Sequence, residues 1–257
     1  AGIMTDIPFE LLGYAPGKIA VATIFMPAEA ERKATALEVF EKTFSFYGLK
    51  VMDYREVPTN PDVLGPIARE SLPAITQAII ERPAHCRTDA AFDRLLYAAK
   101  QHVRTQQREH GIVKAFFFAS LSANTIVYKA LTTAADLPRF YPDLRNPDYK
   151  TRFALFHRRF STNTRTAWDK VQPFRLIGHN GEINTIAGNR SWGLSREKSL
   201  GLQSDELLTL KGISDSGTLN ELAEALKYRS SIPNLEDILA IMIPPAHDNN
   251  RYYNFWG

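Results

Sequence analysis

The sequence has only one cysteine, Cys86, among its 257 residues. A single thiol cannot form a disulfide within the chain, and the lack of a cysteine framework is typical of a reducing compartment, so we expect a cytoplasmic protein. One cysteine also cannot hold an iron–sulfur cluster, and the sequence has no glycine-rich phosphate loop. The six histidines lack the spacing of metal ligands. We therefore expect no cofactor and no metal in this chain.

Long apolar runs and a leader segment are lacking as well. The longest apolar stretch, residues 115–121, is shorter than the ~18 residues that a membrane helix requires, and it includes Ser120. The chain starts at Ala1 instead of Met and shows no signal-peptide pattern, which indicates a start within a longer protein or after processing. The lack of a membrane segment predicts a soluble protein.

The net charge is also small, +3 from 31 basic and 28 acidic residues, which by itself does not indicate a nucleic-acid partner. Residues 145–175, however, hold eight basic and two acidic side chains, a local excess of six positive charges. A solvated basic face and a site for an anionic group are both open interpretations. A nucleic-acid surface is a third, but the segment lacks the aromatic residues interleaved with basic ones that such binding uses, so we expect no nucleic-acid partner.

The spacing of apolar residues predicts the elements of the first third of the chain. Residues 19–26 form a β-branched apolar run that predicts a strand. An apolar stripe at helical spacing over residues 30–47, closed by Gly48, predicts the helix that follows. Residues 49–57 predict a second strand, which stops at Pro58 because proline cannot donate to a ladder, and residues 75–81, a short apolar run between two proline-containing segments, predict a third.

The remaining elements come in blocks of strands and helices. We expect a long helix that ends at Gly111 and starts at Thr88 or Asp89, either of which is a plausible N-cap. The further expected strands are residues 113–120, 124–131, 153–160 and 174–178, and the further expected helices are residues 182–192, 219–228 and 235–243, the last with a capping box of Asn234 and Asp237. Such blocks favour two stacked sheets covered by helices over one doubly wound sheet, so we expect an α/β (α+β) fold.

Two polar segments, residues 157–164 and 179–184, are candidates for acyl-transfer chemistry. In the first, a predicted strand ends in a loop that follows two arginines, and in the second a predicted strand ends in Asn180–Gly181 before a helix. The Asn180 amide and the Gly181 backbone N–H, which no Cβ obstructs, could together hold the oxyanion of a tetrahedral intermediate. An Asn–Gly pair also forms hairpin turns, and that alternative stays open.

Charged residues near these segments are candidates for binding an amino acid. A guanidinium binds a carboxylate through two parallel hydrogen bonds, so Arg158 or Arg159 could hold an α-carboxylate. Either arginine could also lie on the surface without a ligand. In a third polar segment, residues 214–218, Asp215 could face an α-ammonium group or cap the helix that follows.

Together the segments resemble a known family. HRRFSTNT (157–164), QPFR (172–175), HNGEINTIAGNRSW (179–192) and SDSGTLNELAE (214–224) resemble the glutaminase domain, a class II glutamine amidotransferase, of glutamate synthase. AGIMTDIP near the start, REVPTNPDVLGP, SLSANTIVYKAL and RFYPDL are similar to the same family. The resemblance covers nearly the whole chain. It implies a four-layer α/β/β/α sandwich of the N-terminal-nucleophile hydrolase type, and an oxyanion hole formed by Asn180 and Gly181.

The resemblance also implies how L-glutamine is bound. Arg159 would bind the α-carboxylate and Asp215 the α-ammonium group. Phe160 would lie in a mobile loop over the site, and Thr162 and Asn163 would help to hold the substrate. In the wider class the position of Asn163 is often a histidine, so this residue departs from the common pattern.

One feature of the family is absent from the sequence. The nucleophile of the family is a chain-initial cysteine in a first strand, whereas Cys86 lies inside the chain, where its own α-amine cannot act as the base. We therefore expect residues 1–257 to be a partial amidotransferase domain that lacks its nucleophile-bearing first strand and its C-terminal part, and that is inactive alone. The alternative is a non-catalytic domain that binds glutamine or acts as a scaffold.

The resemblance finally implies partners beyond the substrate. Glutamine would be hydrolysed to glutamate and ammonia through a cysteine thioester. The ammonia would pass to a synthase domain, on the same or a partner polypeptide, that aminates 2-oxoglutarate with FMN and an iron–sulfur cluster. We thus expect L-glutamine and that synthase domain as partners, and no membrane.

Overall fold

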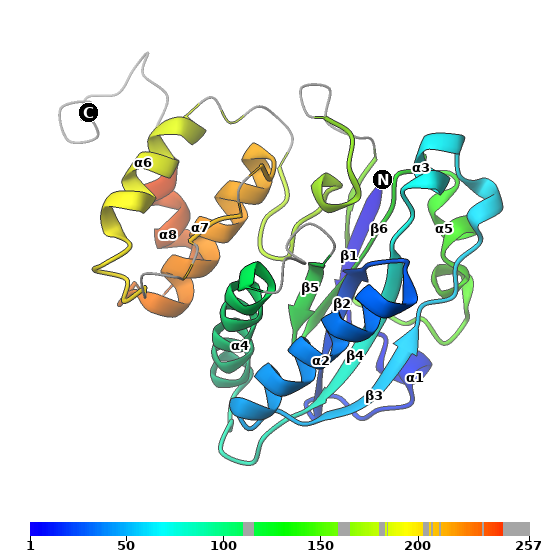
Figure 1. Cartoon of the computed structure of the whole chain (residues 1–257), viewed down its shortest axis with the longest axis horizontal. Helices are drawn as coiled ribbons and strands as arrows, with labels where there is room; N and C mark the ends of the chain where they lie inside the picture. Colours follow the sequence, from blue (N-terminus) through cyan, green and yellow to red (C-terminus); the bar gives the residue numbers. More distant parts are fainter. Residues whose placement is uncertain are drawn as a thin grey trace. The chain divides into compact units, whose positions relative to one another are not determined.

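The computed structural model describes residues 1–109, 116–158, 165–179, 183, 185–202, 206, 208–210, 212–232 and 234–243. The chain divides into two compact units, one of residues 1–181 with 205–207 and the other of residues 182–204 with 208–257. The first unit contains both β-sheets, and the second contains helices α6 to α8 (Figure 1).

Two antiparallel sheets form the frame of the first unit. The four-stranded sheet has the order β3 (Val51–Glu56), β4 (Ala74–Glu81), β2 (Ile19–Met26) and β5 (Phe117–Ser122). The three-stranded sheet has the order β6 (Thr125–Lys129), β1 (Gly2–Asp6) and β7 (Ala154–His157). Strands β5 and β6 are adjacent in the sequence but belong to different sheets, so the short turn between them carries the chain from one sheet to the other.

Side-chain alternation along β2 explains how the layers stack. Every residue of β2 is buried, because the strand has neighbours on both sides and is covered on both faces. Ala22 and Ile24 belong to a cluster with the apolar stripes of α2 (Ala30–Phe46) and α4 (Asp89–Glu109). Val21, which points the other way, belongs to a second cluster. Helices α2 and α4 therefore cover one face of the four-stranded sheet (Figure 1).

The second cluster fills the space between the two sheets. It joins Ile79 of β4 to Ile126 and Tyr128 of β6, and it includes Phe140 and Trp168 from segments outside the strands. The first unit thus has a layer of helices, a four-stranded sheet and a three-stranded sheet. This arrangement confirms the predicted α/β class with two stacked sheets and covering helices.

A buried polar network joins the two sheets through this apolar layer. The Asp143 carboxylate, 3% exposed, accepts two hydrogen bonds from the guanidinium of Arg55 on β3, at 2.6 and 2.7 Å, and one from the Tyr128 hydroxyl at 2.7 Å. The Gln77 side chain on β4 donates to the Tyr128 hydroxyl at 3.0 Å and accepts from Arg55 at 3.0 Å. Each polar atom named here has a partner, as burial requires.

The second unit packs three helices. They are α6 (Ile186–Arg196), α7 (Asp215–Arg229) and α8 (Leu235–Met242). The Asn189 side chain on α6 donates to the Met242 carbonyl of α8 at 2.9 Å, and Arg190 on α6 donates to the Thr218 hydroxyl of α7 at 3.0 Å. Gly193 lets α6 and α7 approach closely, since a Cβ there would lie 2.7 Å from a methyl carbon of Leu222.

Most of the predicted elements are confirmed. Helix α2 ends just before Gly48, which has φ +68°. The Thr88 hydroxyl caps α4 by accepting from the Ala91 N–H at 3.1 Å. The short helices, which were not predicted, are α1 (Phe9–Leu12), α3 (Pro66–Glu70) and α5 (Leu137–Phe140), with 3-10 turns at η1 (Pro61–Val63), η2 (Pro142–Arg145) and η3 (Trp168–Lys170).

Several predicted strands differ from the structure. Residues 174–178 form no strand, because this segment pairs with neither sheet and bends at Arg175 and Leu176. The strand predicted over 153–160 ends at His157, and the one predicted over 113–120 begins at Phe117; residues 113–115, 159 and 160 lie outside the described ranges. Strand β1 was not predicted, since five residues with Gly2 and Asp6 at the ends carry too short an alternation.

The helix starts of the second unit also differ. Helix α6 begins at Ile186 instead of residue 182, and α7 begins four residues earlier than predicted, at Asp215. The predicted capping box of α8 is wrong. Asn234 occupies the N-cap position without capping the helix, because its amide donates to the Asp237 carboxylate at 3.2 Å.

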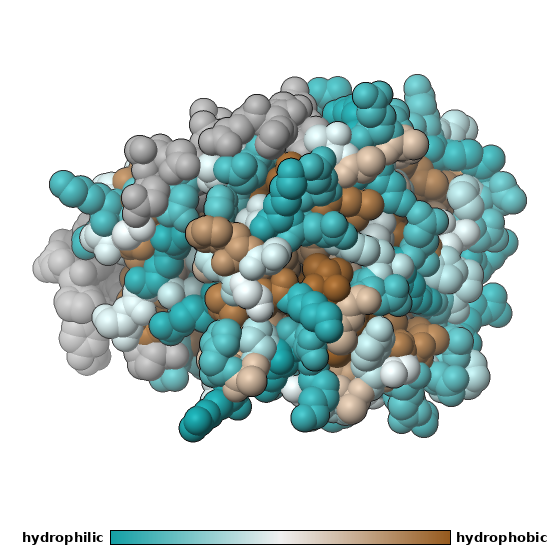
Figure 2. All heavy atoms as spheres, turned by 60° about the horizontal axis from the view of Figure 1, so that its bottom comes forward, coloured by the Kyte–Doolittle hydropathy of each residue, from teal (hydrophilic) through white to brown (hydrophobic). Residues whose placement is uncertain are grey.

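The surface of the protein carries both hydrophobic and hydrophilic residues. Figure 2 shows one face, on which hydrophobic residues lie in small groups between hydrophilic ones. Such a distribution is typical of a surface that faces water. None of the described helices is both long and apolar enough to cross a membrane.

Candidate functional site

A cavity of about 1470 Å³ opens in the first unit, at the end of the three-stranded sheet where β1 begins and β7 ends. It is larger than the few hundred Å³ that a small ligand needs. Five segments and three single residues line it: Ala1, Val63 and Thr166, residues 65–68 at the start of α3, residues 131–136 after β6, residues 155–158 at the end of β7, Gln172 with Pro173, and Gly178 with His179.

Two glycines let one wall of this cavity approach the sheet. A Cβ at Gly2 would lie 2.3 Å from the carbonyl oxygen of Gln172, so the segment of Gln172 rests directly on the backbone of β1. A Cβ at Gly178 would lie 2.6 Å from a methyl carbon of Leu155 on β7. A larger residue at Gly2 would push Gln172 away from the backbone of β1, whereas one at Gly178 would displace the Leu155 side chain.

The side chain of Arg175 ties the same segment to helix α4. Its guanidinium lies 3.8 Å from the Asp93 carboxylate, and these two side chains are only 9% and 11% exposed. Asp93 also accepts from the backbone N–H of Ala123 at 2.8 Å, so it joins α4, the β5–β6 turn and the QPFR segment. Buried and paired charges of this kind hold their elements in one register.

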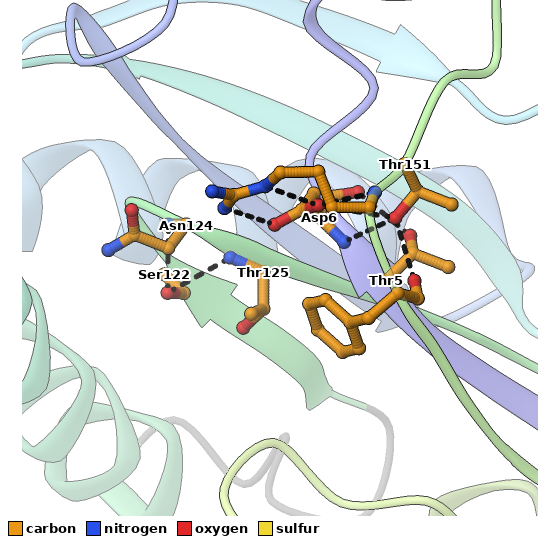
Figure 3. Close-up of polar contacts among 8 residues, drawn as sticks. Thr5, Asp6, Ser122, Asn124, Thr125 and Thr151 are labelled. Atoms are coloured by element: carbon orange, nitrogen blue, oxygen red, sulfur yellow. Dashed lines mark hydrogen bonds and ion pairs between the residues drawn. The ribbon is translucent and has the colours of Figure 1, made fainter.

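A second group of polar residues lies just before β7, at the end of β1 that is farther from the cavity (Figure 3). The Asp6 carboxylate accepts from the backbone N–H of Arg152 at 2.8 Å and from its guanidinium at 2.9 and 3.1 Å. The Asp6 N–H donates to the Thr151 hydroxyl at 3.1 Å, and that hydroxyl donates to the Phe153 carbonyl at 2.7 Å. Hydrogen bonds from Arg152 hold the pKa of the Asp6 carboxyl below its usual value. This cluster sets where β7 starts and therefore where it ends at the cavity.

Six of the seven predicted site residues fall outside the described ranges: Arg159, Phe160, Thr162, Asn163, Asn180 and Gly181. Their chain neighbours, however, are described. Arg158, which precedes Arg159, and His179, which precedes Asn180, both line the cavity. The two predicted segments therefore both continue from the rim of the same cavity.

The seventh predicted residue, Asp215, is the first residue of α7 in the second unit. Its carboxylate accepts from the Ser216 N–H at 2.7 Å and from the Ser216 hydroxyl at 3.3 Å. The interpretation of Asp215 as the helix cap is wrong, because Ser214 caps α7 by accepting from the Gly217 N–H at 3.1 Å. A carboxylate in the first turn is still favoured by the helix dipole.

Sequence reasoning missed one buried charge beside the cavity, Lys129 at the end of β6. Its side chain is 0% exposed, and its Nζ donates to the carbonyls of Val171 at 2.8 Å and Asp169 at 3.3 Å. Burial lowers the pKa of its ammonium to about 7, and the charge of Asp169 opposes this shift. The available signal was a lysine that follows the apolar run TIVY within a predicted strand.

The chain does not fit an iron–sulfur cluster, which its family resemblance implies for the synthase domain. Iron–sulfur clusters are held by several cysteines, whereas Cys86 stands alone, buried, with the pKa of its thiol raised by burial. Across the described ranges no group of three or more His, Cys, Asp or Glu side chains could hold a metal ion. No step below uses such a group.

Comparison with known proteins agrees with the sequence motifs. Residues 1–254 match the family model of class-II glutamine amidotransferases. The chain therefore belongs to this family. Its mixed α/β structure with two antiparallel sheets and covering helices is consistent with the N-terminal-nucleophile type of amidotransferase fold.

Glutamate synthases are among the curated relatives that the chain matches. It is 39% identical to ferredoxin-dependent glutamate synthase 2 of Synechocystis sp. and 36% identical to ferredoxin-dependent glutamate synthase of Cyanidium caldarium; each alignment covers 97% of this chain and 17% of the relative. It is 33% identical to glutamate synthase [NADH] of Schizosaccharomyces pombe, over 98% of this chain and 13% of the relative. The chain thus spans about one-sixth of the length of its first relatives.

Proposed function

We propose that this chain is the glutamine-binding part of a glutamate synthase and contributes to the hydrolysis of L-glutamine to glutamate and ammonia. The observation that carries the proposal is that the HRRFSTNT and HNGEIN segments both continue from the rim of one cavity, through Arg158 and His179. The family match over residues 1–254 and the glutamate synthase relatives support the same substrate.

Each predicted residue then has a role in binding. Arg159 holds the α-carboxylate of glutamine through two parallel hydrogen bonds, and Asp215 binds the α-ammonium group. Phe160 covers the bound substrate, while Thr162 and Asn163 contact it. A hydrogen-bonded guanidinium fixes both the position and the rotation of a carboxylate, which a lysine ammonium cannot do.

The chemistry is acyl transfer to a cysteine. A thiolate forms a bond to the side-chain amide carbon of glutamine, and the carbonyl oxygen becomes an oxyanion that the Asn180 amide and the Gly181 N–H stabilise. The C–N bond then breaks, ammonia leaves with the proton that the thiol gave up, and water hydrolyses the thioester to glutamate and restores the thiol. Cys86 does not serve as this thiolate, because it is buried and the pKa of its thiol is raised. We therefore expect the 257 residues alone to release no ammonia.

The proposal extends to the fate of the ammonia. We place its use in a synthase domain that aminates 2-oxoglutarate with FMN and an iron–sulfur cluster, on this or a partner polypeptide. The relatives that are named glutamate synthase are several times longer than the chain, which leaves room for further domains. The cytoplasmic location stays a prediction.

The test starts from the gene upstream of Ala1. If that reading frame encodes a cysteine at the start of the mature protein, the whole gene product should release ammonia from glutamine. Arg159→Lys should then raise the glutamine KM by ~10-fold or more, because one of two charge-assisted hydrogen bonds is lost. Asn180→Ala should lower kcat by ~100-fold or more if the amide holds the oxyanion.

Arg145→Lys is the matched control, since Arg145 is exposed and does not line the cavity. It should leave KM and kcat unchanged. A KM of Arg159→Lys equal to that of the control would refute the role of Arg159, and a normal kcat of Asn180→Ala would refute the oxyanion role. Glutamine binding without any ammonia release by the whole gene product would instead support the non-catalytic alternative.

A further inference from the structure

Lys129 has an environment that is unusual for a lysine. Its side chain is completely buried, and within the described part of the chain it forms no ion pair with a carboxylate. Instead its Nζ donates to two backbone carbonyls and lies 4.6 Å from the ring centre of Phe117 and 4.5 Å from that of Phe174. Burying an ammonium is costly unless such partners replace water, and aromatic faces and carbonyls both stabilise the cation.

Three of the four partners of Lys129 belong to one segment that has no place in either sheet, and the fourth, Phe117, lies on β5. The carbonyls of Asp169 and Val171 and the ring of Phe174 lie in residues 169–174, which no strand holds. Ladder hydrogen bonds do not fix this segment, so contacts of other kinds, including side-chain anchors, hold it on the sheet. Lys129 supplies two hydrogen bonds and a ring contact to it within six residues.

Lys129 also lies in the same row of the three-stranded sheet as His157, which lines the cavity. Gly2 of β1 pairs with Lys129 on one side and with His157 on the other, so the three residues form a row across the three-stranded sheet. Gln172 and Pro173 rest on Gly2, and His157, Gln172 and Pro173 all line the cavity. The segment held by Lys129 therefore forms a cavity wall and continues to His179.

We propose that Lys129 is a positioning residue, whose buried side-chain nitrogen holds residues 169–174 on the sheet and thereby places His179, the residue before Asn180, at the cavity. This inference rests on the proposed function, because Asn180 and Gly181 matter only if they hold an oxyanion. A displacement of about 1 Å in such a group is enough to lower a rate ~100-fold. Binding of the α-carboxylate, which is assigned to the segment after β7, does not depend on Lys129.

The test uses Lys129→Met in the whole gene product, since methionine keeps the unbranched chain and removes both the charge and the donors. We expect kcat for ammonia release to fall ~10-fold or more, with the glutamine KM unchanged within about 2-fold. In the absence of substrate, amide hydrogen exchange of residues 169–178 should become ~10-fold faster or more, while strands β2 and β4 keep their protection.

Two further variants separate positioning from simple loss of stability. Asp143→Ala breaks the polar network between the sheets and contacts no residue of the 169–178 segment, so it should destabilise the first unit without lowering kcat. Phe174→Leu removes one ring beside the ammonium and keeps the charge. If Lys129→Met does not fold, Phe174→Leu should still show a smaller loss of kcat with an unchanged KM.

The possible results decide between the claims. Unchanged exchange of residues 169–178 in Lys129→Met would overturn the anchoring, and faster exchange with normal kcat would overturn the link to catalysis. A rise in KM equal to the fall in kcat would also overturn it. If the unaltered gene product released no ammonia, the proposed function would fail, and the exchange experiment would still decide whether Lys129 anchors the segment.

Discussion

Replacing Asp143 with alanine should destabilise the first unit by about 3 kcal/mol or more, because it breaks the polar network between the two sheets. The change removes a carboxylate that is 3% exposed and accepts three hydrogen bonds. It leaves the Arg55 guanidinium, a quarter exposed, without its anion, and the Tyr128 hydroxyl, 1% exposed, without an acceptor. Domains of this kind have a total stability of only about 5–15 kcal/mol, so the loss is large.

The assay is urea unfolding followed by the fluorescence of Trp168, which is buried between the sheets against Phe25 and Phe140. The other two tryptophans, Trp192 and Trp256, are replaced by phenylalanine so that the signal reports on the first unit. A lower urea midpoint at an unchanged slope would give the loss of stability directly.

Glu81→Ala is the matched control, since it removes the ion pair of Glu81 with Lys50, whose side chains are 49% and 72% exposed. Exposed pairs contribute about 0–1 kcal/mol. If Asp143→Ala cost no more than this control, the network would not hold the sheets together. The double variant Arg55→Met/Asp143→Leu should be more stable than Asp143→Ala alone, because no buried cation is left unpaired.

Two further outcomes follow from the same structure. Ser214→Ala removes the N-cap of α7 and should lower the stability of the second unit by about 1 kcal/mol, measured by urea unfolding with Trp192 on α6 as the probe. The pKa of Lys129 is lowered to about 7 in the folded chain from 10.5, with Asp169 as the opposing charge, so above pH 7 the unfolded chain binds more protons. The free energy of unfolding should therefore rise by up to about 1.4 kcal/mol per pH unit between pH 7 and 10, and equal slopes in the unaltered protein and Lys129→Met would contradict this.

The sequence pattern predicted the strands and helices whose side chains change environment with the period of the element. The strand at residues 19–26 and the helix at residues 30–47 were predictable because their side chains alternate between two apolar layers or form one buried stripe. Gly48 and Thr88 mark helix ends through chemistry that depends only on the adjacent turn. Such features need no knowledge of the rest of the fold.

The elements that sequence reasoning missed depend on partners far away in the chain. Strand β1 exists because β6 and β7 pair with it, more than 100 positions later. Residues 174–178 have the pattern of a strand but no ladder partner, and the segment is held instead by Arg175 and the close contact at Gly178. The role of Lys129 likewise depends on carbonyls about 40 residues away, which no local pattern can show.

The local excess of six positive charges over residues 145–175 is explained by these tertiary contacts. Three of its basic residues form ion pairs with carboxylates outside the segment: Lys150 with Glu10, Arg152 with Asp6, and Arg175 with Asp93. These three pairs reduce the local excess from six positive charges to three. Arg158, another of the basic residues, lines the cavity. Nucleic acids bind to a continuous basic face, whereas one carboxylate needs a single well-placed guanidinium. The charge of this segment is therefore better suited to fixing β7 and its neighbours, and to presenting one arginine to the α-carboxylate of glutamine, than to binding a polyanion.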